Sequence, residues 1–185
     1  MRIEVEQKFT VADRAALERR LTEMATTGPP TRAVQIDNYF AHPSRDFAST
    51  DEALRLRYVD EHNYITYKGP KLDTTTKTRR EIELALPDGS QAAAESAELL
   101  EVLGFRRVAQ VKKRRDHMVV EWQSRPVEVS LDEVEGLGTF VELEILADQS
   151  ELEAARACMT SLCEHLNLGK GERRSYLELL LAERE

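Results

Sequence analysis

Alternation of apolar and polar residues dominates this chain and predicts a protein rich in β-strands. In the first stretch, Ile3, Val5 and Phe9 fall on one face, while Glu4 and Glu6 fall on the other. Side chains of a strand alternate between two faces, so this period of two is typical of a half-buried strand. The same pattern recurs along the chain, and it predicts strands over residues 2–9, 32–40, 53–60, 63–69, 78–86, 106–122, 126–133 and 139–147.

Apolar residues at steps of three and four predict helices between these strands. Leu17, Leu21 and Met24 share one helical face, and a second helix follows Ser90 and ends at Gly104. A third helix starts at Ser150, and a short last helix covers about residues 176–180. Eight strands, mostly in antiparallel order, with four helices make an α+β chain whose sheet is large enough to close into a barrel. At 185 residues we expect a single domain, with C-terminal helices from about residue 150.

Charged residues fill the polar face of seven of the predicted strands. The first strand contributes Glu4, Glu6 and Lys8. The later strands contribute Arg55 and Arg57; Lys68; Arg79, Glu81 and Glu83; Lys113 and Arg115; Glu128 and Asp132; and Glu142 and Glu144. The amphipathic helices can cover the apolar faces, so the charged faces must line either open water or the inside of a barrel. An open sheet rich in salt bridges is the alternative to a barrel with a charged interior.

The register of the sixth strand is ambiguous, because residues 112–115 are all basic. Alignment with Val111 places Lys113 and Arg115 together, whereas Lys112 and Arg114 face the other way. Either pair fits the inward face on pattern alone.

Composition narrows the function classes. The chain holds 26 Lys and Arg against 34 Asp and Glu, a net charge of −8, which argues against general nucleic-acid binding. No apolar run approaches the roughly 20 residues that span a bilayer, and no signal segment opens the sequence, so we expect a cytoplasmic protein without a membrane partner. The four histidines are scattered, and no nucleophile elbow, Walker loop or dinucleotide fingerprint occurs.

The charged residues themselves favour a site for a polyphosphate and a metal ion. Clustered carboxylates bind hard cations such as Mg²⁺ or Mn²⁺ through oxygen. Arginine and lysine side chains bind phosphate oxygens. A polyphosphate bridged to the carboxylates by a divalent ion would satisfy both kinds of side chain.

The motif Glu4-x-Glu6-x-Lys8 near the start of the chain resembles the signature of the CYTH superfamily, the triphosphate tunnel metalloenzymes. Its companions occur in the family's order: Arg55-x-Arg57, Lys68 in Thr-Tyr-Lys-Gly-Pro, Arg79-x-Glu81-x-Glu83, Lys113-x-Arg115, Asp132 in Ser-Leu-Asp-Glu-Val, and Glu142-x-Glu144. Residues 45–57 and 132–142 are most similar to the class IV adenylyl cyclase branch. The resemblance implies a closed eight-stranded antiparallel barrel that forms a tunnel.

The resemblance also implies a role for each motif residue. Lys8, Arg55, Arg57, Lys68, Arg79, Lys113 and Arg115 would bind the triphosphate. Glu4, Glu6, Glu81, Asp132, Glu142 and Glu144 would hold Mg²⁺ or Mn²⁺, with two ions expected. Lys8 and Glu83 are the expected catalytic residues, Glu83 as a neighbour of the metal ligands.

The expected activity is that of a class IV-type adenylyl cyclase, which converts ATP to cyclic AMP and pyrophosphate. An inorganic, nucleoside or thiamine triphosphatase is the alternative, because the two reactions could share nearly all of these residues. A non-catalytic polyphosphate or nucleotide binder is a third reading. The expected partner is ATP or another triphosphate, and the resemblance leaves a homodimer open.

Overall fold

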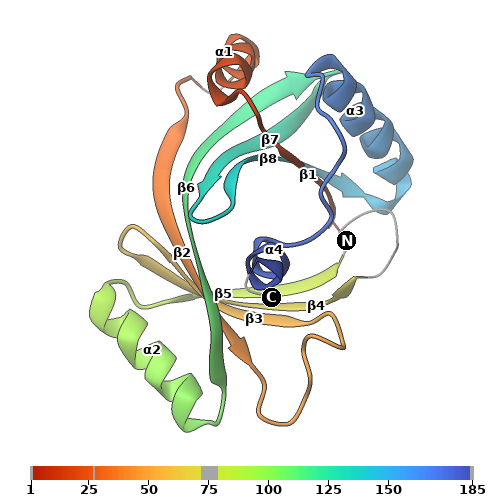
Figure 1. Ribbon diagram of the computed structural model, residues 1–185. Helices are drawn as coiled ribbons and strands as arrows, with labels where there is room; N and C mark the ends of the chain where they lie inside the picture. Colours follow the sequence, from red (N-terminus) through yellow and green to blue (C-terminus); the bar gives the residue numbers. More distant parts are fainter. Residues whose placement is uncertain (1, 27, 72–78, 184–185) are drawn as a thin grey trace. The chain divides into compact units, whose positions relative to one another are not determined.

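The computed structural model describes residues 2–26, 28–71 and 79–183, with only the backbone described at residues 2, 3, 71 and 79. In this part of the chain we find eight β-strands and four α-helices (Figure 1). In chain order they are β1 (Arg2–Thr10), α1 (Arg14–Met24), β2 (Thr31–Ala41), β3 (Ala53–Val59), β4 (His62–Lys71), β5 (Arg79–Leu86), α2 (Ser90–Val102), β6 (Arg106–Trp122), β7 (Arg125–Val134), β8 (Gly138–Asp148), α3 (Leu152–His165) and α4 (Tyr176–Ala182). The eight strands and four helices predicted from the sequence are confirmed.

The strands form one sheet in the order β1-β8-β7-β6-β2-β3-β4-β5. The pairs β1–β8, β7–β8, β2–β3, β3–β4 and β4–β5 are all antiparallel. An α+β fold with an eight-stranded antiparallel sheet is therefore confirmed. Strands β1 and β5 stand at the two ends of this order, so the closed barrel implied by the resemblance stays a prediction.

The chain divides into two compact units. Among the described residues, the first unit comprises residues 2–26, 28–32 and 114–173, and the second comprises residues 33–71, 79–113 and 174–183. Two long strands, β2 and β6, contribute residues to both units.

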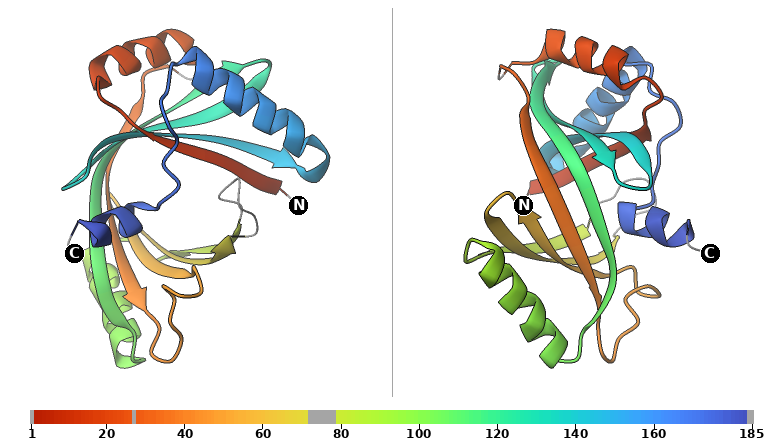
Figure 2. Two further views of the ribbon diagram at one scale, coloured as in Figure 1. Left: turned by 45° about the vertical axis from the view of Figure 1, so that its right-hand side comes forward. Right: turned by 60° about the vertical axis from the view of Figure 1, so that its left-hand side comes forward.

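In the first unit, helices α1 and α3 cover the apolar face of the sheet, as Figure 2 shows. Val5 and Phe9 of β1 and Leu143 of β8 are buried against Leu21 of α1 and Met159 of α3. These strand residues alternate with charged ones, so burying one face leaves the charged face uncovered by helix. The prediction that amphipathic helices cover the apolar faces is confirmed for this unit.

In the second unit, α2 packs against β3 over a smaller core. Leu54 and Leu56 of β3 are buried together with Ala97 and Leu100 of α2. This core leaves the outward-facing apolar residue Leu84 of the end strand β5 59% exposed.

Helix α4 also belongs to the second unit and begins with a capping box. The Ser175 hydroxyl accepts a hydrogen bond from the Glu178 backbone N–H at 3.1 Å, and the Glu178 side chain accepts one from the Ser175 backbone N–H at 2.6 Å. Tyr176 and Leu179 of this helix are buried.

None of the helices in residues 2–26, 28–71 and 79–183 has the length and apolar character needed to cross a membrane.

Candidate active site

Strand pairing in the first unit places carboxylates directly opposite one another. Glu6 of β1 faces Glu144 of β8, and Glu144 in turn faces Glu128 of β7. Opposed residues of an antiparallel pair have Cβ atoms about 5 Å apart. Three carboxylates therefore form a row across three adjacent strands, and Glu4 lies on the same face of β1 two residues before Glu6.

This row perturbs the ionisation of its middle member. Burial, together with the charges of Glu128, Glu6 and Glu142, raises the pKa of Glu144 from 4.5 to about 7. Like charges held close in a poorly solvated place disfavour ionisation. A cation beside Glu144 would remove this penalty, which is the behaviour expected of a carboxylate in a metal site.

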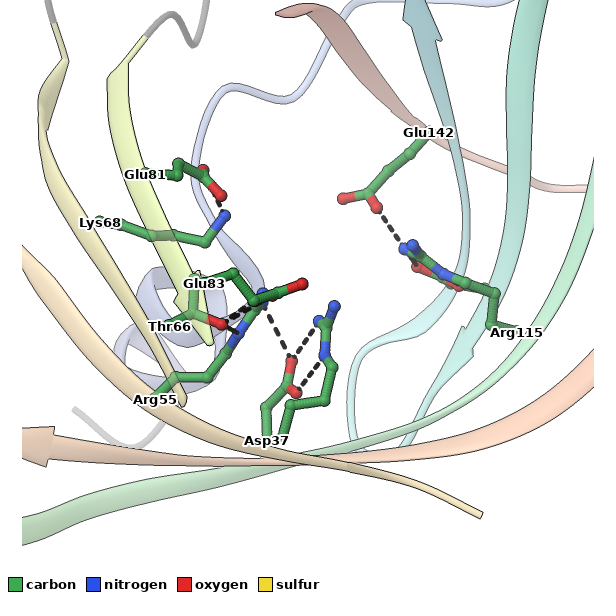
Figure 3. A network of polar contacts seen from close by, with 10 residues as sticks. Asp37, Arg55, Thr66, Lys68, Glu81, Glu83, Arg115 and Glu142 are labelled. Atoms are coloured by element: carbon green, nitrogen blue, oxygen red, sulfur yellow. Dashed lines mark hydrogen bonds and ion pairs between the residues drawn. The ribbon is translucent and has the colours of Figure 1, made fainter. Parts of the chain in front are cut away.

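Lys8 and Arg115 supply positive charge in the same unit. Lys8 lies opposite Glu142 in the β1–β8 pair and is only 1% exposed. Arg115 donates hydrogen bonds from Nε and Nη2 to the two carboxylate oxygens of Asp132, at 2.7 and 2.5 Å, and also bonds Glu142 (Figure 3). Asp132 is completely buried. Arg115 is thus bound by two of the predicted metal ligands, so acidic and basic side chains are paired directly here.

The structure settles the register of the basic run in β6. Lys113 is buried at 3% exposure, whereas Lys112 and Arg114 are exposed, and Arg114 bonds Glu133. Arg115 faces Asp132 instead. The pair Lys113 and Arg115 is therefore the one on the enclosed face of its strand, as alignment with Val111 predicted.

Asp37 organises a cluster of arginines in the second unit. It lies on β2 directly opposite Arg57 of β3. Arg57 donates from Nε and Nη2 to the two Asp37 oxygens at 2.7 and 2.8 Å, and Nη1 of Arg55 reaches Asp37 at 3.4 Å (Figure 3). This bidentate pairing fixes the plane of the Arg57 guanidinium group.

The arginine cluster stabilises the ionised form of Asp37. Burial on its own would raise the pKa of Asp37, but the charge of Arg55 and the hydrogen bond and charge of Arg57 outweigh it. The result is a pKa of about 2, against an ordinary value of 3.8. Burial lowers the pKa of Arg55, while the nearby charge of Asp37 raises it, and the net pKa is raised. The Arg55 guanidinium group therefore stays charged in its buried position.

The neighbouring strands β4 and β5 add two further pairs to the second unit. The Thr66 hydroxyl donates to Glu83 at 2.8 Å, and Arg55 lies 3.6 Å from the same carboxylate. Lys68 bonds Glu81 at 2.5 Å. Figure 3 shows these side chains gathered around Arg55. The predicted catalytic residue Glu83 thus lies among predicted phosphate ligands.

Two other predicted phosphate ligands belong to the second unit. The Lys113 Nζ atom lies 4.9 Å from the centre of the Tyr176 ring at the start of α4, a geometry typical of a cation–π contact. The side chain of Arg79 lies outside the described residues, although its backbone belongs to β5. The structure thus brings Arg55, Arg57, Lys68 and Lys113 into one unit.

The donor set fits a divalent ion that shares its coordination with a substrate. Among the described residues, no group of three or more His, Cys, Asp or Glu side chains is arranged so that it could hold a metal ion by itself. Mg²⁺ is usually bound by one or two carboxylates together with waters and phosphate oxygens. Glu6 and Glu144, opposed on neighbouring strands, can supply such a partial set, with Glu4 and Glu142 beside them.

Comparison with known proteins finds relatives of this chain over nearly its whole length. The family of the CYTH domain matches residues 2–176, which include residues of both units. The chain belongs to the CYTH domain family. A Methanocaldococcus jannaschii protein named "Putative adenylate cyclase" is 37% identical over 96% of this chain and 98% of its own. Adenylate cyclase CyaB of Aeromonas hydrophila is 28% identical over 96% of this chain and 88% of its own.

A solved structure also resembles this CYTH chain over its length. The PH1819 protein of Pyrococcus horikoshii is 39% identical, with a TM-score of 0.84 over 98% of this chain and 99% of that one. The family, the α+β class and the antiparallel sheet inferred from the sequence are thereby confirmed.

Sequence reasoning missed three residues of this CYTH site. Asp37 and Thr66 lie on the polar faces of their strands but stand apart from the charged motifs, and Glu128 was left without a role. Asp37 lies opposite Arg57, and Glu128 lies opposite Glu144. The alternation of β2, which places Val34 and Ile36 on one face and Gln35 and Asp37 on the other, was the signal available for Asp37. The side chain that each of these residues faces depends on which strands pair and in which register. Alternation along a single strand does not specify that pairing.

Proposed function

We propose that this chain is a divalent-metal-dependent enzyme that acts on a triphosphate. The observation that carries the proposal is the row of Glu6, Glu144 and Glu128, in which the pKa of Glu144 reaches about 7. A purely structural sheet gains nothing from opposing carboxylates, because like charges in opposed positions are destabilising. A cation bound beside these carboxylates would neutralise their repulsion, so the repulsion favours cation binding.

The second unit supports the phosphate-binding half of the proposal. Arg55, Arg57 and Lys113 are buried or half-buried cations around the single carboxylate of Asp37. Phosphoryl-transfer enzymes rely mainly on positioning and on neutralising the charge of phosphate oxygens. Guanidinium groups held in a fixed plane are suited to that task. A closed eight-stranded barrel forms part of the proposal.

The reaction that we propose is the adenylyl cyclase reaction, supported by the names of the two sequence relatives. The 3′-hydroxyl of ATP attacks the α-phosphorus, and pyrophosphate leaves. Divalent ions at Glu6 and Glu144 would lower the pKa of the attacking hydroxyl and neutralise charge on the leaving pyrophosphate. Lys8 and Arg115 bind phosphate oxygens, and Arg115 exchanges its carboxylate partners for the substrate. Glu83 orients Arg55.

Product analysis tests this proposal. The protein is incubated with Mg²⁺ or Mn²⁺ and either ATP or tripolyphosphate, and the products are separated by ion-exchange chromatography. Cyclic AMP with pyrophosphate is the expected result with ATP. Release of orthophosphate from either compound would replace the cyclase with a triphosphatase. Absence of turnover with every triphosphate, across metals and pH, would contradict both activities.

A further inference from the structure

A histidine continues the row of carboxylates onto a fourth strand of the first unit. The row runs from Glu6 of β1 through Glu144 of β8 to Glu128 of β7, and these residues lie opposite one another in the strand pairs. Strand β6 follows β7 in the sheet. Its residue His117 places the Nε2 atom 3.5 Å from the Glu128 Oε2 atom. Four adjacent strands therefore each contribute one side chain of a type that binds metal ions.

His117 lies on the face of β6 that carries the site residue Arg115. Side chains two residues apart share one face of a strand, and His117 follows Arg115 by two residues. Arg115 bonds Asp132 of β7, and His117 meets Glu128 of the same strand. This face of β6 is therefore the one turned toward the carboxylates of β7. The sequence gave no sign of this placement, because it depends on how the two strands pair.

The separation and exposure of His117 and Glu128 suit a shared metal ion. Two atoms that bind one ion at about 2.1 Å lie about 3.0 to 3.5 Å from each other, and the Nε2 and Oε2 atoms are 3.5 Å apart. The two side chains are 38% and 49% exposed, so an ion and its water ligands can reach both. An ion pair between side chains this exposed contributes little to the stability of a fold.

Glu128 also acts on the middle carboxylate of the row. After burial, the charge of Glu128 is the largest contribution to the raised pKa of Glu144, ahead of the other two carboxylates that contribute. Like charges raise a carboxyl pKa in this way when the groups are near neighbours. One cation placed between Glu144 and Glu128 would neutralise their repulsion, and His117 stands on the far side of Glu128 from Glu144.

We propose that His117 and Glu128 bind one divalent ion next to Glu144, and that the imidazole ligand makes this site prefer Mn²⁺ to Mg²⁺. The inference rests on the proposed function and names the metal for it. Mg²⁺ takes oxygen ligands, whereas ions of the first transition series, from Mn²⁺ onward, also bind imidazole nitrogen. Water and substrate phosphate oxygens supply the remaining ligands, since among the described residues no three such side chains could hold an ion by themselves.

Metal binding to the full chain tests this assignment without using activity. Mn²⁺ binding is measured from the electron paramagnetic resonance signal of the free ion, and Mg²⁺ binding from its competition with Mn²⁺. His117→Gln removes the imidazole and keeps a polar side chain. His62→Gln is the matched control, because His62 is also exposed and lies 3.0 Å from an Asp88 oxygen. That pair belongs to the second unit and lies outside the row.

We expect the wild type to bind Mn²⁺ at least about tenfold more tightly than Mg²⁺. His117→Gln should weaken Mn²⁺ binding about tenfold or more and change Mg²⁺ binding less than about twofold, whereas His62→Gln should change neither. Electron spin-echo spectra of the Mn²⁺-loaded wild type should show coupling to an imidazole nitrogen, and His117→Gln should lose this coupling while circular dichroism shows an intact fold.

Three results would overturn the role of His117 and leave the proposed function standing. The first is unchanged Mn²⁺ binding in His117→Gln. The second is an equal effect on both ions, as expected if His117 only pairs its charge with Glu128. The third is the absence of nitrogen coupling in the wild type. A wild type that binds neither ion, even with tripolyphosphate present, would overturn both the metal site and the proposed function.

Discussion

Replacing Asp37 with asparagine removes the negative charge between two guanidinium groups while keeping the size of the side chain. The folded-state pKa of Asp37 is about 2, against 3.8 ordinarily. This difference corresponds to about 2 kcal/mol of stability at pH 7. Because the folded-state value is the lower one, the stabilisation is complete above about pH 4 and is lost as the pH falls through 2.

Urea unfolding followed by far-ultraviolet circular dichroism measures this contribution. We expect Asp37→Asn to lower the free energy of unfolding by about 2 kcal/mol at pH 7 and by about half as much at pH 3. Asp88→Asn is the control. Asp88 is exposed, and among the described residues its ion pair is with the exposed His62. The substitution should lower the free energy of unfolding by less than about 0.5 kcal/mol. An Asp37→Asn variant as stable as wild type at pH 7, or equally weakened at both pH values, would refute the assigned role.

Three further predictions concern the charged residues. Glu144→Gln should raise the free energy of unfolding of the metal-free protein by about 1 to 2 kcal/mol at pH 8 and leave it unchanged at pH 4. The reason is that the pKa of Glu144 is raised to about 7, so its ionisation at higher pH destabilises the wild type. Urea unfolding at both pH values measures this effect, and an equal change at pH 4 and pH 8 would contradict the prediction. Lys113→Ala should weaken tripolyphosphate binding about tenfold or more, while Lys112→Ala changes it less than twofold, since of these two lysines only Lys113 is buried. Titration calorimetry measures both dissociation constants. A larger effect of Lys112→Ala would show that the register assigned to the basic run of β6 is wrong. Arg57→Ala should chiefly raise KM in a steady-state assay, and unchanged KM and kcat would remove Arg57 from the site.

The strands and helices could be predicted from the sequence because their patterns are local. Residues 106–122 were predicted as one strand, and the structure has β6 over the same range. The burial of Lys113 beside the exposed Lys112 also follows from alternation once Val111 is placed in the core. Periodicity of two or 3.6 residues is a property of short windows, so it needs no knowledge of long-range contacts.

The partners of the charged residues could not be predicted in the same way. Arg115 was expected to face phosphate, and in the structure it bonds Asp132 and Glu142. Asp37 and Arg57 are 20 residues apart in the chain and meet only because β2 and β3 pair in one register. Pairing register depends on turns and on packing against the helices, and a charge count along single strands does not contain it.

Metal-dependent turnover in the wild type and in Glu6→Gln tests the central claim most directly. Glu6 lies opposite Glu144, so the amide keeps the side-chain size and removes one carboxylate from the proposed metal site. Hydrolysis or cyclisation of ATP is followed with increasing Mg²⁺ or Mn²⁺, and circular dichroism checks the fold of each protein. We predict that the wild type turns over triphosphate only with the metal, and that Glu6→Gln folds normally and loses this activity. Metal-independent turnover, or full activity in Glu6→Gln, would contradict the account.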